Sequence, residues 1–387
     1  MKRPRIALLR GPYLGLFEAQ NYEPLLENFD VCAYILPQNL FDLTRCALPV
    51  RVCRYADSGL FGGRSLLNAW RTRLLGQRYP MPGVPAIVRG SNLVHTFEGW
   101  YTYTRQAAAA CRRHNVPLVI THWDTEPYEG TLPLKERQQI ARVYAVATRV
   151  LAATEAARLA LLKNGVEESK ILVQGMGVDS GRFSPGPRDE ALAARLRIAP
   201  RDFVFLYIGR LVQDKGVRLL MDAFQRVCHG WESRNLRLLL VGDGPEAEWI
   251  HRAAQERGLQ DRVIIAPSVS YMEIHPWYRL GDVFVYPSIP SRGVAEQFGY
   301  ALVEAMSAGR AIITTGTGGI PDVVGDAARI VPARDLGALA DAMATLLRDS
   351  DERSRLAKRA RSRAVAGFSA AAVSARLGQV YRELCGS

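Results

Sequence analysis

Short apolar stretches that alternate with helix-like stretches constrain the fold of this chain more than any other feature. In the first half, six apolar runs have the length and composition of buried strands, at residues 6–9, 31–36, 92–97, 118–121, 150–153 and 171–173. Amphipathic stretches fall between them, notably at 103–114, 134–147 and 154–164. Continuous apolar strands that alternate with helices are typical of a parallel sheet covered by helices, so we expect a doubly wound α/β fold.

The alternation stops once, at residues 179–190, and then starts again. This stretch, DSGRFSPGPRDE, combines proline, glycine and charge without periodicity, which is typical of a linker. Strand-like runs follow at 203–208, 236–241, 263–266 and 284–286, and a further strand is expected between the segments EQFGYALVEAMSAG and TGGIPDVVG. A chain of 387 residues also exceeds the usual size of a single core. We therefore predict two Rossmann-like domains, at residues 1–178 and 201–370, joined by a linker at 179–200.

Residues 284–325 carry the densest set of candidate binding residues. Glu296 lies in a loop after a short strand, and Gly299 precedes a helix-like run that contains Glu304. Because the first turn of a helix leaves amides unpaired, this helix end would attract phosphate. Glu304 lies about one and a half turns into the helix, where its carboxylate suits sugar hydroxyls better than phosphate. Glu296 could accept hydrogen bonds from a second sugar. A diphosphate between two sugars, a nucleotide sugar, fits this arrangement.

Two cations follow the strand at 203–208. Arg210 and Lys215 belong to the segment YIGRLVQDKG. Arginine binds oxygens in a bidentate manner and lysine acts as a compact charge, so the pair suits a diphosphate and the negative charge that grows when a sugar leaves it. The alternative is a solvated turn, in which basic residues are common.

Three segments resemble glycosyltransferase family 4, the retaining nucleotide-sugar transferases of GT-B fold. They are EQFGYALVEAMSAG with the downstream TGGIPDVVG, then YIGRLVQDKG, and VGDGPEAE. The resemblance covers most of the chain and is strong in its second half. It implies two Rossmann-like domains that face each other across a crevice, the first binding the acceptor and the second the donor. It also implies that a C-terminal helix at 371–387 packs back on the first domain.

The resemblance further implies a set of site residues. The implied catalytic residues are His122, Arg210, Lys215 and Glu296. The implied donor-binding residues are Gly15, Gly209, Arg210, Lys215, Gly242, Glu296, Phe298, Gly299, Tyr300, Ala301, Leu302 and Glu304. If the two cations neutralise the diphosphate, no metal is needed, and we expect no cofactor.

Three of these positions have alternatives. His122 directly follows the strand at 118–121, where the family frequently has a histidine that orients and polarises the donor sugar; a lone histidine is otherwise more often structural. Gly15 stands beside Leu14, where the family often has a pair of glycines. Gly242 either has a structural role or borders the nucleotide base. His95, at the end of another strand with Glu98 nearby, is expected to be a buried structural histidine.

The net charge of +12 calls for an anionic partner. Residues 45–113 contain eleven arginines against Asp57 and Glu98, which leaves nine positive charges. Within this segment, residues 59–79 have the pattern of a basic amphipathic helix, which can lie on anionic lipid. The alternatives are an anionic acceptor, or a helix whose apolar face is core and whose arginines are solvated. Nucleic-acid binding is not expected, because no recognised module is present.

Together these features predict a retaining glycosyltransferase that moves a hexose from a UDP- or GDP-linked sugar to a lipid-linked or glycan acceptor. The alternatives are another GT-B reaction, such as an epimerase, and a catalytically silent scaffold that binds nucleotide sugars or membranes.

The six scattered cysteines are expected to be free thiols. No apolar run reaches the roughly 18 residues that span a bilayer, and we expect no signal peptide because only four apolar residues directly precede Arg10. We expect a cytoplasmic protein, peripheral at the inner face of the membrane.

Overall fold

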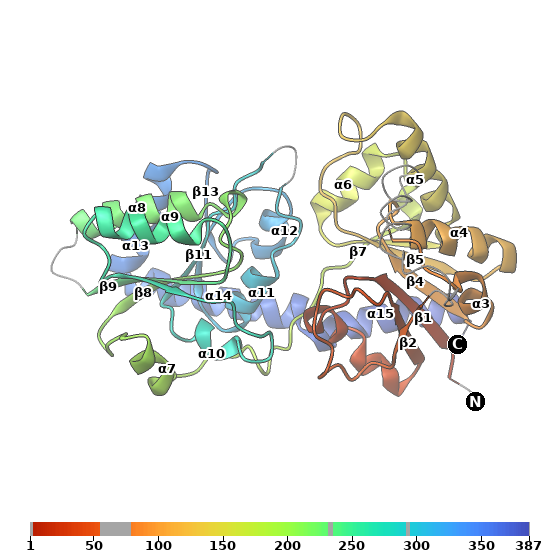
Figure 1. The fold of residues 1–387 in the computed structure, drawn as a ribbon, viewed down its shortest axis with the longest axis horizontal. Helices are drawn as coiled ribbons and strands as arrows, with labels where there is room; N and C mark the ends of the chain where they lie inside the picture. Colours follow the sequence, from red (N-terminus) through yellow and green to blue (C-terminus); the bar gives the residue numbers. More distant parts are fainter. Residues whose placement is uncertain (1–2, 55–78, 231–234, 292–294, 387) are drawn as a thin grey trace, which may run out of the picture. The chain divides into compact units, whose positions relative to one another are not determined.

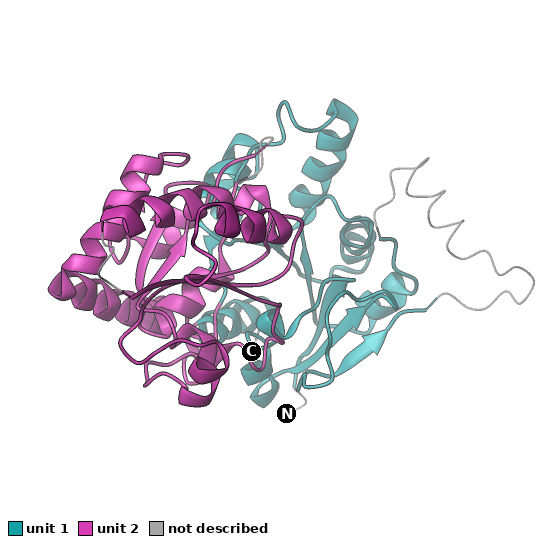
Figure 2. Ribbon diagram, turned by 60° about the vertical axis from the view of Figure 1, so that its left-hand side comes forward, with its two compact units in different colours: residues 1–176, 373–387 teal, residues 177–372 magenta. Residues whose placement is uncertain are grey.

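The chain divides into two compact units (Figure 2). The computed structural model describes residues 3–54, 79–230, 235–291 and 295–386 (Figure 1). Unit 1 comprises residues 1–176 and 373–387, and unit 2 comprises residues 177–372. The basic helix predicted at 59–79 lies outside the described residues except for Tyr79.

Unit 1 contains a seven-stranded sheet in the order β3-β2-β1-β4-β5-β6-β7, in which all neighbouring strands are parallel. Its strands are β1 (Arg5–Gly11), β2 (Asp30–Ile35), β3 (Val50–Val52), β4 (Leu93–Phe97), β5 (Leu118–His122), β6 (Arg149–Ala152) and β7 (Ile171–Val173). Its helices are α1 (Leu16–Ala19), η1 (Glu23–Glu27), α3 (Val84–Arg89), α4 (Thr102–His114), α5 (Leu134–Val146), α6 (Glu155–Lys163) and η2 (Glu168–Lys170). The last helix, α15 (Ala370–Cys385), begins in unit 2 and continues in unit 1.

The sheet of unit 1 has an apolar core on each face. Successive side chains of a strand point to opposite faces, and in β1 they divide accordingly. Ile6 and Leu8 pack with the α15 side chains Val373 and Tyr381, whereas the intervening Ala7 packs with residues of α4 and α5. Burial on both faces explains why these strands are continuous apolar runs.

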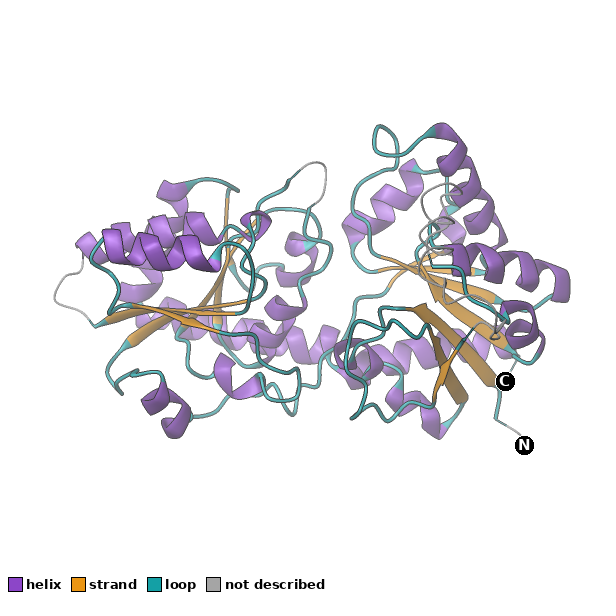
Figure 3. Cartoon of the chain, viewed as in Figure 1, coloured by secondary structure: helices purple, strands orange, loops and turns teal. Residues whose placement is uncertain are grey.

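Unit 2 contains a six-stranded parallel sheet in the order β10-β9-β8-β11-β12-β13. Its strands are β8 (Phe203–Ile208), β9 (Leu236–Val241), β10 (Val263–Ala266), β11 (Val283–Tyr286), β12 (Ala311–Thr315) and β13 (Arg329–Val331). Its helices are α7 (Glu190–Arg195), η3 (Gln213–Lys215), α8 (Val217–Gly230), α9 (Ala247–Glu256), α10 (His275–Tyr278), α11 (Tyr300–Ser307), α12 (Ile320–Val324), α13 (Leu336–Arg348) and α14 (Ser350–Phe368). Figure 3 shows helices on both faces of each sheet.

The predicted doubly wound architecture is confirmed in both units. The sequence pattern missed two strands, β3 and β13, which are edge strands of three residues each. The segment predicted as a linker, 179–200, contains the short helix α7 and belongs to unit 2. All six cysteines are free thiols, as expected. Within the described ranges, no helix combines the length and the apolar character needed to cross a bilayer.

Candidate functional site

The carboxyl ends of β8 and β11 define the candidate site of unit 2. In the strand order of this sheet, β8 lies between β9 and β11, so the chain leaves β8 towards one edge and later returns to its other side. Open α/β sheets bind ligands outside the carboxyl ends of the strands at such a switch point. Gly209 and Arg210 directly follow β8, and the loop after β11 carries Glu296. The topology therefore brings the two predicted segments to one edge of one sheet.

Lys215 and Glu296 form an ion pair at this edge. The Lys215 Nζ lies 2.6 Å from the Glu296 Oε2, and the two side chains are only 14% and 12% exposed. The Tyr286 hydroxyl, at the end of β11, donates to the same carboxylate oxygen at 2.9 Å. Burial and the nearby Glu296 raise the pKa of Tyr286 well above its usual value, so the hydroxyl keeps its proton. The arrangement places a cation and a carboxylate, both largely shielded from water, at the switch point.

Arg210 is exposed beside this pair. Its carbonyl accepts a hydrogen bond of 2.7 Å from the Tyr207 hydroxyl, which fixes the backbone of the turn. The guanidinium lies close enough to Tyr207 and Tyr286 to lower the pKa of both hydroxyls, although burial dominates and raises them. Among the described residues, no carboxylate forms an ion pair with Arg210. Its charge is therefore available to a ligand.

Gly216 lets the Lys215 turn lie directly against the end of β11. It has a left-handed backbone (φ +69°), and a Cβ atom there would lie 2.0 Å from the carbonyl oxygen of Pro287. Next to it, the Asp214 carbonyl accepts hydrogen bonds from the Ile289 amide at 2.8 Å and the Ser288 hydroxyl at 3.1 Å. These contacts join the loop after β8 to the loop after β11.

Gly209 and Gly242 also have a steric reason to be glycine. They follow the adjacent strands β8 and β9, and a Cβ on Gly242 would lie 2.0 Å from the carbonyl oxygen of Gly209. The Gly209 amide donates to the Val241 carbonyl at 3.0 Å, so the two backbones run in contact. The structure thus supports the structural alternative for Gly242 and leaves its contact with a donor as a prediction.

Helix α11 begins where the sequence predicts. Gly299 precedes it in a left-handed conformation (φ +80°), and Gly309 follows it in another (φ +68°). The side chains of Phe298 and Leu302 are buried, so only their backbone groups are available to a ligand, whereas Tyr300 and Ala301 are half-buried. The helix N-terminus therefore presents backbone at the same carboxyl edge as Lys215.

Glu304 is buried within unit 2 and accepts a hydrogen bond from the Tyr278 hydroxyl of α10. Burial raises the pKa of Glu304 to about 7, against the opposing effects of the Tyr278 hydrogen bond and the charge of Arg182. The contact between Tyr278 and Glu304 was not predictable from spacing, because the two residues are 26 positions apart along the chain and lie in different helices, α10 and α11. The carboxyl group thus keeps its proton to a higher pH than an exposed glutamate does.

In unit 1, His122 forms a buried cluster at the ends of β4 and β5. Its Nδ1 lies 2.9 Å from the Glu98 Oε2 and 2.9 Å from the Tyr144 hydroxyl. Glu98 has a left-handed backbone (φ +49°), unusual for a residue other than glycine, and its Oε1 accepts the Trp123 amide. The Nε2 of His122 has no hydrogen-bond partner among the described residues. Although burial alone lowers the pKa of His122, the Glu98 carboxylate raises it above its usual value.

The second histidine of this sheet is a useful contrast. His95 is fully buried, and both of its ring nitrogens have partners: the Tyr381 hydroxyl at 2.6 Å and the Thr121 hydroxyl at 2.8 Å. Burial and the charge of Arg10 lower its pKa to about 3, so its ring stays neutral. This confirms the structural role expected for His95. The sequence placed Glu98 near His95, but the structure pairs this carboxylate with His122.

Gly15 precedes the short helix α1, and its carbonyl accepts hydrogen bonds from the amides of Glu18 and Ala19. Its backbone is extended (φ −122°), so no left-handed conformation requires glycine there. A Cβ atom would instead lie 2.3 Å from the ring of Phe17. Gly15 belongs to unit 1, whereas the other predicted donor-binding residues belong to unit 2.

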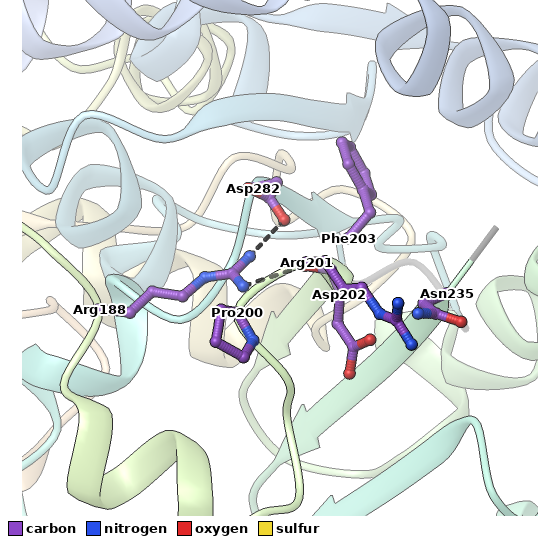
Figure 4. A pocket seen from close by; sticks show the side chains of 7 residues that line it. All are labelled: Arg188, Pro200, Arg201, Asp202, Phe203, Asn235 and Asp282. Atoms are coloured by element: carbon purple, nitrogen blue, oxygen red, sulfur yellow. Dashed lines mark hydrogen bonds and ion pairs between the residues drawn. The ribbon is translucent and has the colours of Figure 1, made fainter.

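A separate cavity of about 650 Å³ lies at the opposite ends of the strands in unit 2 (Figure 4). It is lined by Phe203, Asn235 and Asp282, which stand at the amino ends of β8, β9 and β11, together with Arg188, Pro200, Arg201 and Asp202. Arg188 donates to the Asp282 carboxylate at 2.6 Å and to the Asp202 carbonyl at 3.0 Å. Because these groups are already paired and lie at the amino ends, this cavity is not the candidate site.

Comparison with known proteins shows which family this chain resembles in sequence. Residues 189–363, which contain Arg210, Lys215, Glu296 and Glu304, match the family model described as "Glycosyl transferases group 1". The chain is 30% identical over 294 residues to D-inositol 3-phosphate glycosyltransferase of Frankia alni, covering 71% of this chain and 70% of that protein. It is 29% identical over 300 residues to the protein of that name from Nocardia farcinica, covering 75% of this chain and 64% of the relative.

Among solved structures, HepE of Anabaena in complex with UDP superposes with a TM-score of 0.79 at 19% identity, covering 98% of this chain and all of the other. Two Rossmann-like units, each with a parallel sheet, define the GT-B fold of glycosyltransferases, and this chain has it. The chain belongs to the group 1 glycosyltransferases.

Proposed function

We propose that the protein is a retaining, metal-independent hexosyltransferase that uses a UDP- or GDP-linked sugar and a glycan or lipid-linked acceptor. The observation that carries this proposal is the shielded pair of Lys215 and Glu296 beside the exposed Arg210, at the switch point of unit 2. The comparisons support a nucleotide sugar, since HepE was solved with UDP and with UDP-glucose.

The donor diphosphate would bind Arg210, Lys215 and the first-turn amides of α11. Lys215 already contacts Glu296 at 2.6 Å, so a bound diphosphate would share this ammonium with the carboxylate. As the sugar departs, negative charge grows on the diphosphate, and preorganised cations stabilise that charge most in a shielded site. Metal would then be unnecessary. In the described part of the chain, no group of three or more His, Cys, Asp or Glu side chains is placed to hold a metal ion.

The two glutamates would bind the two sugars of the donor. In this proposal Glu304 accepts hydrogen bonds from the nucleotide ribose and Glu296 from the transferred hexose. The remaining donor contacts would come from backbone groups of Gly209, Gly242, Phe298 and Gly299 through Leu302, with Gly15 contributed by unit 1. The buried side chains of Phe298 and Leu302 agree with a role limited to their backbone.

His122 would contact the transferred sugar through Nε2. Because Glu98 and Tyr144 both lie at Nδ1, that nitrogen is held within the cluster and Nε2 is left to a ligand. The carboxylate favours an imidazolium or an Nδ1–H tautomer, and both orient the ring. The role is to orient and polarise the sugar. The departing phosphate, in this proposal, takes the proton of the acceptor.

For the whole chain, we propose an acceptor-binding domain at 1–178, a linker at 179–200 and a donor-binding domain at 201–370, with 371–387 packed on the first. We also propose that the protein acts in the cytoplasm and that its basic segment, 45–113, contacts an anionic membrane surface. The support is the excess of nine positive charges in that segment.

The experiment that tests the function is a thermal-shift panel of UDP, GDP, ADP and their common sugar conjugates, followed by analysis of the product. One nucleotide family should raise the melting temperature selectively. With that donor and a glycan acceptor, in the presence of EDTA, NMR of the product should show the anomeric configuration of the donor.

Arg210→Ala should lower turnover by about 100-fold or more, as expected for losing a preorganised charge. Inversion, a strict need for metal, or no product would contradict the proposal.

A further inference from the structure

Four aromatic side chains gather at the carboxyl ends of β1 and β4 in unit 1. Tyr13 lies two residues after β1, and Trp100 and Tyr101 follow β4. The Tyr13 ring lies 5.4 Å from Tyr79, edge to face, and 5.6 Å from Tyr101. Trp100 and Tyr101 have ring centroids 4.0 Å apart. We call Tyr13, Tyr79, Trp100 and Tyr101 the aromatic cluster.

The aromatic cluster occupies the switch point of the first sheet. β1 lies between β2 and β4, so the strand order reverses there as it does at β8 in unit 2. Crevices at such positions are the preferred ligand sites of open α/β sheets, and ligand sites are commonly lined by aromatic rings with a few polar groups. The cluster is also near His122, since Glu98 affects both the pKa of His122 and that of Tyr101.

Three rings of the aromatic cluster are partly exposed, and the fourth is buried. Tyr13, Tyr79 and Trp100 are half-buried and pack against the core of unit 1, whereas Tyr101 is 7% exposed. The Tyr13 hydroxyl donates to the Tyr79 hydroxyl at 2.7 Å. Burial, together with this hydrogen bond, raises the pKa of Tyr13 to about 12, so the hydroxyl is neutral under physiological conditions. Rings with one apolar end and one polar end suit a ligand that is apolar on one face and hydroxylated at its rim.

Among the described residues, the charged groups at these strand ends already have partners, including Arg105, which donates to the Trp100 carbonyl at 3.2 Å and to Gln139 at 2.7 Å. The Arg10 Nε lies 2.7 Å from both carboxylate oxygens of Glu18, and its guanidinium lies 4.3 Å from the centroid of the Phe97 ring. Glu98 is paired with His122. A phosphorylated acceptor would need a cation to compensate its desolvated charge, and Arg10 is committed to Glu18. An uncharged sugar has no such requirement.

We propose that the aromatic cluster binds the acceptor, and that the acceptor presents an uncharged pyranose ring whose C–H face stacks on Tyr13 and Trp100. The inference rests on the proposed glycosyl transfer and names the chemical class of its acceptor. It separates this chain from the relatives named for inositol 3-phosphate, whose acceptor is an anion.

The test is saturation-transfer difference NMR on the full chain, with and without UDP. The probes are methyl β-D-glucopyranoside, methyl β-D-galactopyranoside, methyl α-D-mannopyranoside and, separately, D-inositol 3-phosphate. Saturation should reach the ring protons of at least one glycoside and fall about fivefold or more in Tyr13→Leu and Trp100→Leu, the scale of losing an aromatic contact of about 1 kcal/mol. Tyr34→Leu, a half-buried tyrosine of β2 in the same unit, should leave the signal unchanged.

Two measurements keep the outcomes separable. Tyr13→Phe keeps the ring and should keep most of the signal, which shows whether a loss in Tyr13→Leu reflects stacking or misfolding. UDP binding by calorimetry reports on the proposed donor site, whose charged residues Arg210, Lys215 and Glu296 belong to unit 2. A protein that binds UDP but no glycoside, or whose glycoside signal persists in both leucine variants, overturns the inference and leaves the proposed function standing. Glycoside binding without UDP binding would contradict the proposed function and leave the glycoside site standing. Cluster-dependent binding of D-inositol 3-phosphate alone would overturn the uncharged acceptor.

Discussion

At the scale of single residues, the ion pair of Lys215 and Glu296 leads to a prediction about turnover. Lys215→Met keeps much of the apolar stem but removes the charge that lies 2.6 Å from Glu296. We expect turnover to fall by about 100-fold, because a preorganised cation no longer stabilises the leaving diphosphate. Arg218→Met is the matched control, since it removes a neighbouring cation that pairs with Glu246. Equal losses in the two variants, measured in steady-state assays, would refute the role given to Lys215.

The raised pKa of Glu304 predicts that the free energy of unfolding depends on pH. Its carboxyl ionises near pH 4.5 in the unfolded chain and near pH 7 in the folded protein. Between these values the folded protein binds one more proton than the unfolded chain, so the free energy of unfolding falls as pH rises from about 4.5 to about 7 and then levels off. The shift amounts to roughly 3 kcal/mol.

Urea unfolding from pH 5 to pH 8 measures this dependence. Glu304→Gln can still accept the Tyr278 hydrogen bond but has no proton to lose, so its stability relative to the natural protein should rise across this range. Tyr278→Phe removes the hydrogen bond that opposes the shift, and the decline should then extend to higher pH. Parallel profiles for the natural protein and Glu304→Gln would show that this carboxyl is ionised throughout.

At the scale of elements, the junction between η3 and α8 is Gly216, where the loop after β8 packs against the loop after β11. Gly216→Ala places a methyl group 2.0 Å from the Pro287 carbonyl oxygen in a left-handed backbone. Gly258 has nearly the same backbone (φ +65°) with nothing within 4 Å of a Cβ atom. Gly258→Ala should therefore cost only the strain of the backbone, about 1–2 kcal/mol. Gly216→Ala should cost at least twice as much and also weaken UDP binding, as measured by chemical unfolding and calorimetry. Similar losses of stability in both variants would mean that the loops after β8 and β11 can separate freely.

Strands with apolar side chains on both faces were predictable from the sequence, whereas two of the four edge strands, β3 and β13, were not. β8 and β11 are buried along almost their whole length, whereas β3 and β13 each have two exposed residues in three. An edge strand is specified mainly by the neighbour with which it pairs, so three residues leave little signal in composition. The pattern identified the strands that build the two switch points, and those strands position the candidate site.

Contacts across neighbouring strands were the part of the site that the pattern missed. Phe97 pairs with Thr121 in the register of β4 and β5, so Glu98, which follows β4, lies beside His122, the last residue of β5. Both residues come directly after a predicted strand, and this was the available signal. Using it requires knowing that β4 and β5 are neighbours, which depends on topology. The same holds for Tyr286 and Glu296, which meet through the loop after β11.

At the scale of the whole molecule, the candidate site residues are divided between the two compact units. Each unit has its own parallel sheet, and unit 1 has a core on each face of its sheet. Arg210, Lys215, Glu296 and Glu304 all belong to unit 2, whereas His122 and the aromatic cluster belong to unit 1. The chain passes from unit 2 into unit 1 within α15, whose Val373, Leu377 and Tyr381 are buried in unit 1. The stability of unit 1 therefore depends on residues at the far end of the chain.

Scanning calorimetry should consequently resolve two transitions, and UDP should raise only one of them. A ligand that binds one folded unit stabilises that unit by mass action, so the shifted transition belongs to unit 2. Tyr381→Phe leaves the buried His95 Nδ1 without its partner at 2.6 Å and should lower the other transition, at a cost of about 1–3 kcal/mol. Tyr207→Phe, which removes the 2.7 Å hydrogen bond to the Arg210 carbonyl, should lower the UDP-sensitive transition instead. Two results would contradict separate unfolding: a shift of the same transition in both variants, or an equal rise of both transitions with UDP. The two units would then unfold as one cooperative body, and ligand binding in unit 2 would also stabilise the aromatic cluster of unit 1.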